Sequence, residues 1–311
     1  MRVKSPNPLL KKLDTDAGTK IDRAYLAHLE VPAAKAPAAS SDGVLASTKL
    51  TDAEQEITAG IINPAVPRNI RIDGNVDEID GTVTITGTNF AGKVITEEIQ
   101  ANGTIAKDGN LAFKTVTKID LPIQDHTPTA QTETITVQTA PQNNGNITVT
   151  VTAAAFTAPV PVTVTLDASD HDDVTKTAEA IVTELNDDDD IKAAFTASNE
   201  AGVITLTANE PAANDDDLKI EVDPGSTQMT VAGDSETGEQ GVPYDEISVG
   251  WGDKLGLPYF LTHNTVLAAY LGGTKEANAP SVSVDADELE KNTISLNSAL
   301  NGTAVDIYFI V

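Results

Sequence analysis

Short runs in which apolar and polar residues alternate fill much of the chain after residue 58. In one of them, GTVTITG (81–87), Val83 and Ile85 fall on one face and the threonines fall on the other. Alternation of this kind predicts β-strands, and a polar second face indicates antiparallel sheets with one side in water. The other runs in this part of the chain are NIRIDG (69–74), KVITEEIQ (93–100) and LAFKTVTKIDL (111–121).

The same pattern returns after residue 241, in the runs YDEISVG, TVLAAYLG, PSVSVDA, NTISL and TAVDIYFIV. The last run ends at Val311, which predicts a C-terminal strand held inside a sheet. We therefore expect a discontinuous host domain, residues 58–142 plus 241–311, built as an antiparallel β-sandwich or a barrel-like fold.

Residues 143–240 follow a different pattern. The runs GNITVTVTA and VPVTVTLDA predict a strand pair, and GVITLTAN and DLKIEVD predict two later strands. Between them, a helix over 174–186 is predicted from the spacing of its apolar residues, Val174, Ala178, Ile181, Val182 and Leu185. The order strand–strand–helix–strand–strand describes a small α+β domain inserted into the host domain. The chain as a whole is expected to be mainly β.

Residues 1–57 are predicted to form an N-terminal arm and linker. A short amphipathic helix is expected over 19–30, followed by an extended Pro/Ala/Ser stretch, VPAAKAPAASSDG. Residues 1–45 of the arm hold seven of the 20 basic residues of the chain. We interpret it as a partner-docking segment that becomes ordered on assembly. Its docking residues would be Ile21, Arg23, Tyr25, Leu26 and Leu29.

The charge of the chain limits its partners. Its 311 residues include 47 acidic and 20 basic ones, a formal net charge of −27. Such a charge disfavours nucleic acid and anionic membrane surfaces as partners. No apolar run approaches the length of a membrane span, and the N-terminus lacks the apolar core of a secretory signal. We expect synthesis in the cytoplasm of the host cell.

The four histidines lie in no recognised catalytic or metal-binding motif, so the remaining candidates for a site are clusters of acidic residues. These clusters are DHDD (170–173), DDDD (187–190) and DDD (215–217). Calcium is one interpretation, but the simple runs lack the alternate spacing of an EF-hand loop. The other interpretation is a solvated surface, with Asp170, Asp172 or Asp173 near the helix N-terminus. We favour the second, and expect no enzyme activity, metal or cofactor.

The stretch GWGDKLGLPY (250–259) contains three glycines and the only tryptophan of the chain. A glycine loop that binds phosphate opens a helix, whereas here a β run follows. We therefore predict a structural loop between strands. Gly250, Gly252 and Gly256 would adopt positive φ, and Trp251 and Leu257 would pack on the core.

Several segments resemble a family of virion proteins from tailed bacteriophages, the auxiliary head or capsid decoration proteins of phages with Bacillus-like hosts. The likeness covers about 58–130 and 245–311 and is carried by the phrases NPAVPRNIRIDGN, VTITGTNFAGKVITEEIQANGT, NLAFKTVTKIDLP, VGWGDKLGLPY, NTVLAAYLGGTKEANAPSVSV and NTISLNSALNGTAVDIYFIV. In these relatives the chain passes almost directly from KIDLP to VSVGWGDKLGLP. The inserted segment is similar to a module that recurs in phage head and tail proteins.

This resemblance implies a non-enzymatic structural protein on the exterior of the capsid. Its expected partners are the major capsid protein and neighbouring copies of itself, in a homo-oligomeric arrangement on the particle. Two alternatives stay open. One is a tail-tube or tail-associated subunit, and the other is a surface adhesin whose inserted domain binds a cell-surface ligand.

Overall fold

The chain forms two compact units built almost entirely from antiparallel strands. The computed structural model describes residues 13–14, 20–21, 26–77, 79–167, 173–257, 266–276, 281–285, 288–296 and 298–310. Unit 1 comprises Met1–Asp125 and Asp245–Val311, and unit 2 comprises His126–Tyr244. The expected mainly-β, antiparallel fold is confirmed. The first boundary, expected near 143, lies instead near 126.

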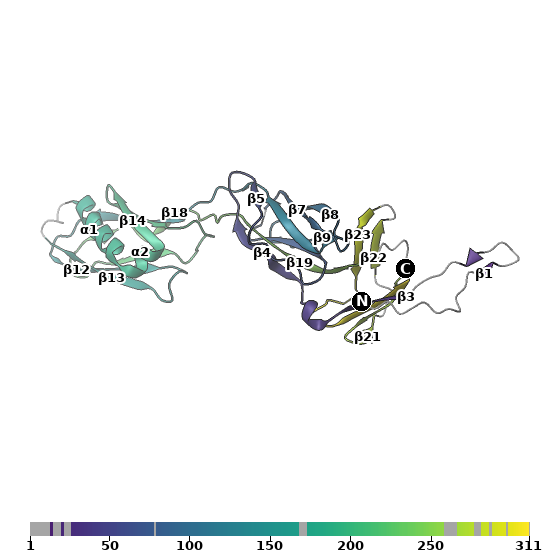
Figure 1. Ribbon diagram of the computed structural model, residues 1–311. Coiled ribbons are helices and arrows are strands. Elements are labelled where there is room, and N and C mark those ends of the chain that lie inside the picture. The colour runs from purple at the N-terminus through teal and green to yellow at the C-terminus, as the bar shows by residue number, and fades with distance from the viewer. Residues whose placement is uncertain are drawn as a thin grey trace. The chain divides into compact units, whose positions relative to one another are not determined.

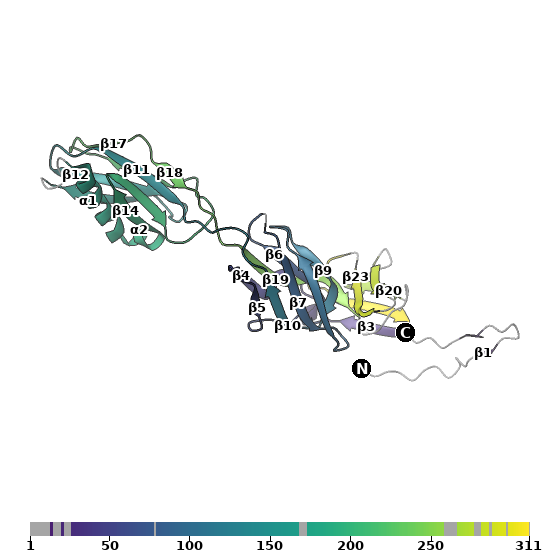
Figure 2. The same cartoon turned by 90° about the horizontal axis from the view of Figure 1, so that it is seen from above.

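Most of unit 1 is a sandwich of two sheets around one apolar core. Val83 and Ile85 are fully buried in it while the neighbouring threonines face outward, as the alternation predicts. One sheet has the order β5-β10-β7-β8, and the other includes β19-β6-β9 with β4 paired to β19 (Figure 2). The strands are β4 (Ser40–Lys49), β5 (Gln55–Ile57), β6 (Arg68–Gly74), β7 (Thr82–Thr88), β8 (Val94–Gln100), β9 (Lys107–Phe113), β10 (Thr115–Leu121) and β19 (Glu246–Gly256).

A second, smaller core in unit 1 lies under a four-stranded sheet of order β21-β20-β24-β3. The C-terminal strand is held between two neighbours in this sheet, as expected. Another strand pair, β22-β23, joins the last two residues of β19. The strands are β3 (Leu26–Val31), β20 (Val266–Leu271), β21 (Thr274–Lys275), β22 (Ser281–Asp285), β23 (Glu288–Ser295) and β24 (Val305–Ile310).

The prediction that residues 1–57 form an arm and linker is wrong for most of the residues that the structure describes there. Leu26 to Val31 form a strand, not the expected helix, because they pair with β24 along their whole length. Ala27, Leu29 and Val31 turn toward the smaller core. A single 3₁₀ turn, η1 (Ala33–Lys35), then leads to β4. Before these, β1 (Leu13–Asp14) and β2 (Lys20–Ile21) form a short antiparallel pair.

In its described residues, unit 2 has two sheets and two helices around a single core. The helix expected over 174–186 spans Val174–Asp187 (α1), and α2 (Asp189–Ala194) follows it against β14 (Figure 1). The predicted five-element order is incomplete, because further strands pair with the expected ones. The strands are β11 (Thr132–Thr139), β12 (Gly145–Thr152), β13 (Val160–Leu166), β14 (Phe195–Glu200), β15 (Val203–Ala208), β16 (Lys219–Asp223), β17 (Thr230–Val231) and β18 (Glu236–Glu239).

The first of these strands explains the shifted boundary. The range predicted for the host domain includes Thr132–Thr139, yet this strand, β11, pairs with β15, β17 and β18 of unit 2. Its alternate residues, including Ile135 and Val137, are buried in the core of that unit. None of the described helices is long and apolar enough to cross a membrane.

Within each unit, the two chain segments that lead to the other unit are hydrogen-bonded to each other. In unit 1, the backbone N–H of Asp125 donates to the Asp245 carboxylate at 2.7 Å. In unit 2, Thr129 and Val242 exchange two backbone hydrogen bonds of 2.8 and 2.9 Å. Unit 2 therefore leaves and rejoins unit 1 at neighbouring residues, which is the geometry that an inserted domain requires.

Candidate functional site

The glycine-rich stretch is a strand and not the loop predicted from the sequence. Gly250, Trp251, Gly252 and Gly256 all lie in β19. Their φ angles are not positive, so the expected reason for the glycines is also wrong. The reason is close packing: a Cβ on Gly250 would collide with the backbone carbonyl of Ser40 on β4. Trp251 is half-buried on the larger core, and its indole N–H donates to the Ala38 carbonyl at 3.0 Å.

A buried asparagine sits where both neighbours of β6 bulge. Three residues of β19, from 252 to 254, oppose Asn69, and three residues of β9, from 109 to 111, oppose the next residue of β6. Asn69 is fully buried, and its side chain makes a hydrogen bond to a backbone group in each bulge. Its Nδ2 donates to the Gly109 carbonyl at 3.1 Å, and its Oδ1 accepts the Lys254 backbone N–H at 2.9 Å.

Charged side chains extend this polar network. The Arg68 guanidinium is buried and donates to the Pro37 carbonyl at 2.7 Å and to Asp253 at 3.1 Å. Burial lowers the pKa of Arg68 to about 10, which leaves it protonated at neutral pH. Arg71 makes two bonds of 2.8 Å to Asp108. These contacts join the segment before β4 to β19, and β6 to β9.

Glu97 on β8 closes one edge of the sandwich. Its carboxylate accepts the backbone N–H groups of Asn110 (2.5 Å) and Leu111 (3.2 Å) on β9. Burial raises the pKa of Glu97, against the lowering effects of these hydrogen bonds and of Lys254. The hydrogen bonds of this network connect β6, β8, β9, β19 and the segment before β4, and the buried Arg68 Nε is left without a partner. We conclude that the glycine-rich stretch and its surroundings are structural.

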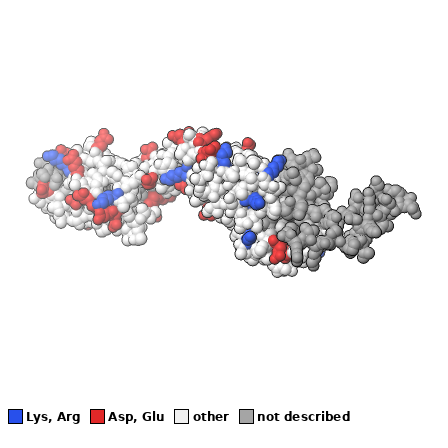
Figure 3. All heavy atoms as spheres, in the orientation of Figure 1, with Lys and Arg blue, Asp and Glu red and all other residues white. Residues whose placement is uncertain are grey.

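The acidic clusters divide into helix caps, turn residues and surface charge. Asp173 caps α1 by accepting the Thr175 N–H, and Asp188 caps α2 by accepting two N–H groups. Asp215 accepts the backbone N–H of Ala154 at 2.6 Å. Asp170 and Asp172 lie outside the described residues. Across the described ranges, no three acidic or histidine side chains are grouped to hold a metal ion. Red acidic side chains recur on both units in Figure 3.

Of the five residues of the predicted docking arm, the structure describes Ile21, Leu26 and Leu29, and these three lie in two different strands. Ile21 lies in the short strand β2, paired with Leu13, and Arg23 and Tyr25 lie outside the described residues. Leu26, at the start of β3, is 67% exposed, whereas Leu29 packs partly against the smaller core. The helical spacing that suggested a stripe does not exist in a strand.

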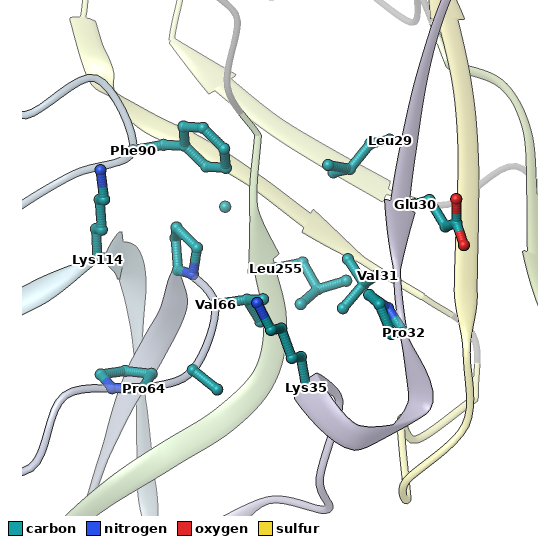
Figure 4. A pocket seen from close by; sticks show the side chains of 13 residues that line it. Leu29, Glu30, Val31, Pro32, Lys35, Pro64, Val66, Phe90, Lys114 and Leu255 are labelled. Carbon is teal, nitrogen blue, oxygen red and sulfur yellow. The ribbon is translucent and has the colours of Figure 1, made fainter. Parts of the chain in front are cut away.

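An apolar cavity of about 300 Å³ lies beside β3, and Leu29, Val31, Val66 and Leu255 of the smaller core form part of its lining. Leu29 and Val31 point toward it, whereas Glu30 points away (Figure 4). Leu255 and Pro67 line its inner part, and the half-exposed Phe90 stands on the far side. Two exposed lysines, Lys35 and Lys114, also line it. This cavity is the best candidate for a docking site in unit 1.

Sequence reasoning missed the cavity because its lining comes from five separate segments. The phrase NPAVP (63–67) supplies Pro64, Val66 and Pro67 and is the one local signal, because a segment with two prolines and a valine in five residues favours an extended backbone. Nothing near Phe90 or Lys114 in the sequence indicates that they share a wall with Leu29.

The outer face of the smaller sheet carries a row of aromatic side chains. The His28 ring stacks on Tyr308 with centroids 4.4 Å apart, and Tyr270 meets Tyr308 edge-on at 6.0 Å. His28 Nε2 also lies 2.8 Å from an oxygen of Asp306. The three rings come from β3, β24 and β20. The sequence gives no sign of this cluster, because its members are far apart along the chain.

No protein-family model matches the chain, and no curated protein matches it. Among solved structures, the flagellar cap protein FliD from Helicobacter pylori is similar, with 10% identity and a TM-score of 0.23. That match covers 84% of this chain and 77% of the other. A likeness at this level carries no argument about fold or function.

Proposed function

We propose that this chain is a non-enzymatic structural protein of a phage virion that coats the outer surface of the capsid. It acts by association alone: unit 1 docks on the shell and beside neighbouring copies, and the acidic unit 2 is a separately folded addition. The partners in this proposal are the major capsid protein and other copies of the chain.

One observation carries the proposal. The phrases that resemble capsid decoration proteins stop near residue 130 and resume near 245, and all but residues 126–130 of them belong to unit 1. In the relatives, the segments on the two sides of this gap follow one another almost directly in sequence. Here Asp125 and Asp245 are hydrogen-bonded at the two sides of the gap. A capsid decoration protein into which a second domain has been inserted explains the interrupted resemblance and the contact between Asp125 and Asp245.

The charge of the chain supports a capsid surface over a site that contacts nucleic acid. A net charge of −27 repels phosphate backbones, and acidic side chains recur over the surface of both units. Packaged DNA lies inside the shell, so a protein of this charge fits the exterior better.

One observation favours a second function, binding of a cell-surface ligand. The row formed by His28, Tyr270 and Tyr308 is a partly exposed aromatic surface of the kind that stacks on sugar rings. However, it lies in unit 1, whereas the adhesin alternative requires the inserted domain to bind the ligand. Adhesion therefore ranks second to the capsid proposal.

Co-sedimentation tests the capsid proposal. Heads and tails would be purified separately from a lysate in which the gene for this chain is disrupted, and each would be mixed with the purified chain. Saturable pelleting with heads and none with tails is the expected result. Pelleting with tails alone would replace the proposal with the tail alternative.

A further inference from the structure

The strand β3 has an unpaired edge. It forms backbone hydrogen bonds with β24 on one side, and no described strand pairs with its other side. An unpaired edge presents backbone N–H and C=O groups that another chain can use to extend the sheet. Protein partners commonly bind in this way, with main-chain hydrogen bonds giving affinity and side-chain pockets giving specificity.

A side-chain pocket lies next to this edge. The cavity described above is lined by four consecutive residues, 29 to 32, that begin in β3. Leu29 and Val31 point into it, so its apolar wall is part of β3 itself (Figure 4). A strand added beside β3 would direct every second side chain toward the cavity. With a volume of about 300 Å³, the cavity has room for one large apolar side chain.

The charge at the rim of the cavity indicates the chemistry of the partner. Lys35 and Lys114 are exposed and line the cavity, and neither forms an ion pair with any residue that the structure describes. In a chain of net charge −27, two unpaired lysines beside one apolar cavity favour an acidic occupant. The N-terminal segment of a second copy fits poorly, because it carries Lys11, Lys12, Lys20 and Arg23.

We propose that β3 is a docking strand for an extended, acidic segment of a protein partner. The segment adds to the sheet beside β3, places one apolar side chain in the cavity and sets carboxylates near Lys35 and Lys114. This deepens the proposed function, because it names the chemistry by which unit 1 attaches to its partner. Only the identity of that partner as a capsid surface rests on the proposed function.

The site is tested with a synthetic peptide and the full-length chain. The probe is a heptapeptide in which Asp, Leu and Asp alternate with Thr, so that the three fall on one face of a strand. Binding should be saturable and should slow hydrogen exchange at the backbone amides of Leu26–Val31. A second peptide with Lys in place of both Asp residues should bind at least about tenfold more weakly.

Two pairs of variants separate the site from general effects. The double variant Lys35→Glu/Lys114→Glu should weaken binding of the acidic peptide about tenfold, whereas Lys275→Glu, a change at an exposed lysine outside the cavity, should not. Ala65→Trp fills the cavity and should abolish binding, whereas Ala34→Trp, on the exposed 3₁₀ turn, should not.

Three results would overturn the docking strand: equal binding of both peptides, binding without protection of β3, or full binding by Ala65→Trp. The co-sedimentation experiment is independent of these. If the peptide binds as expected but the chain pellets with no particle, the docking strand stands and the capsid assignment fails. If the chain pellets with heads but the peptide tests fail, the assignment stands and attachment uses another surface.

Discussion

Replacing Asn69 by alanine tests the inference that the glycine-rich stretch is structural. The side chain accepts the buried Lys254 N–H and donates to the Gly109 carbonyl, and it lies between two bulged strands. In the variant the Lys254 N–H has no partner, which costs about 1–3 kcal/mol. The Gly109 carbonyl keeps its 3.1 Å bond from Lys254 Nζ, so that loss adds only about 1 kcal/mol.

We therefore expect Asn69→Ala to lower the free energy of unfolding of unit 1 by about 2–4 kcal/mol. The single tryptophan, Trp251, lies in unit 1, so its fluorescence reports on this unit alone during urea unfolding. For a slope of roughly 2 kcal/mol per molar urea, the midpoint should fall by about 1–2 M.

Asn102→Ala, at an exposed asparagine of the same unit, is the matched control and should change stability by less than about 0.5 kcal/mol. A midpoint for Asn69→Ala within error of this control would refute the assignment of Asn69 as the residue that satisfies both bulges.

Four further predictions concern other parts of the chain. Glu97→Gln should remove the contribution of this carboxyl to the pH dependence of stability. Because the pKa of Glu97 in the folded protein is raised above 4.5, the native protein binds more protons than the unfolded chain between pH 4.5 and the raised pKa. Wild-type stability should therefore fall relative to that of the variant as pH rises through this window, and an equal change for both proteins across the window would contradict this. Deletion of residues 1–25 should leave the urea midpoint reported by Trp251 fluorescence unchanged. Deletion of residues 1–45 should lower this midpoint strongly, because β3 and half of β4 are lost. Equal midpoints for the two deletions would be incompatible with the strand pairing. Asp173→Ala and Asp188→Ala should each cost unit 2 about 1 kcal/mol through loss of a helix cap, measured by circular dichroism, with Asp234→Ala at an exposed aspartate as the neutral control. Excision of 126–244 with a short Gly/Ser join should leave unit 1 folded, since loop closure changes by only about 1 kcal/mol; loss of the cooperative tryptophan transition would argue against an inserted domain.

Local patterns predicted the elements whose stability is decided locally. Val83 and Ile85 alternate with threonines, and the strand formed as expected because its two faces meet an apolar core and solvent. The helix at Val174–Asp187 carries its own apolar stripe and its own cap, Asp173. In both cases the information lies within a few residues.

Elements that depend on distant partners were not predictable. Leu26 and Leu29 fit a helical stripe, but Ala27, Leu29 and Val31 also fit a strand, and only pairing with β24 near the other end of the chain decides between them. Likewise, Gly250 reads as a turn residue until the close approach of Ser40 is known. The cavity beside β3 was invisible for the same reason, since Leu29, Phe90 and Lys114 meet only in the folded unit.

The most direct test of the central claim is an image of the assembled particle in which this chain is labelled. A small tag on unit 2, at the exposed turn around Gly233, would be located by electron microscopy of intact virions. We predict density for the label distributed over the outer surface of the capsid at regular positions. Label confined to the tail, or no label on purified virions, would contradict the account.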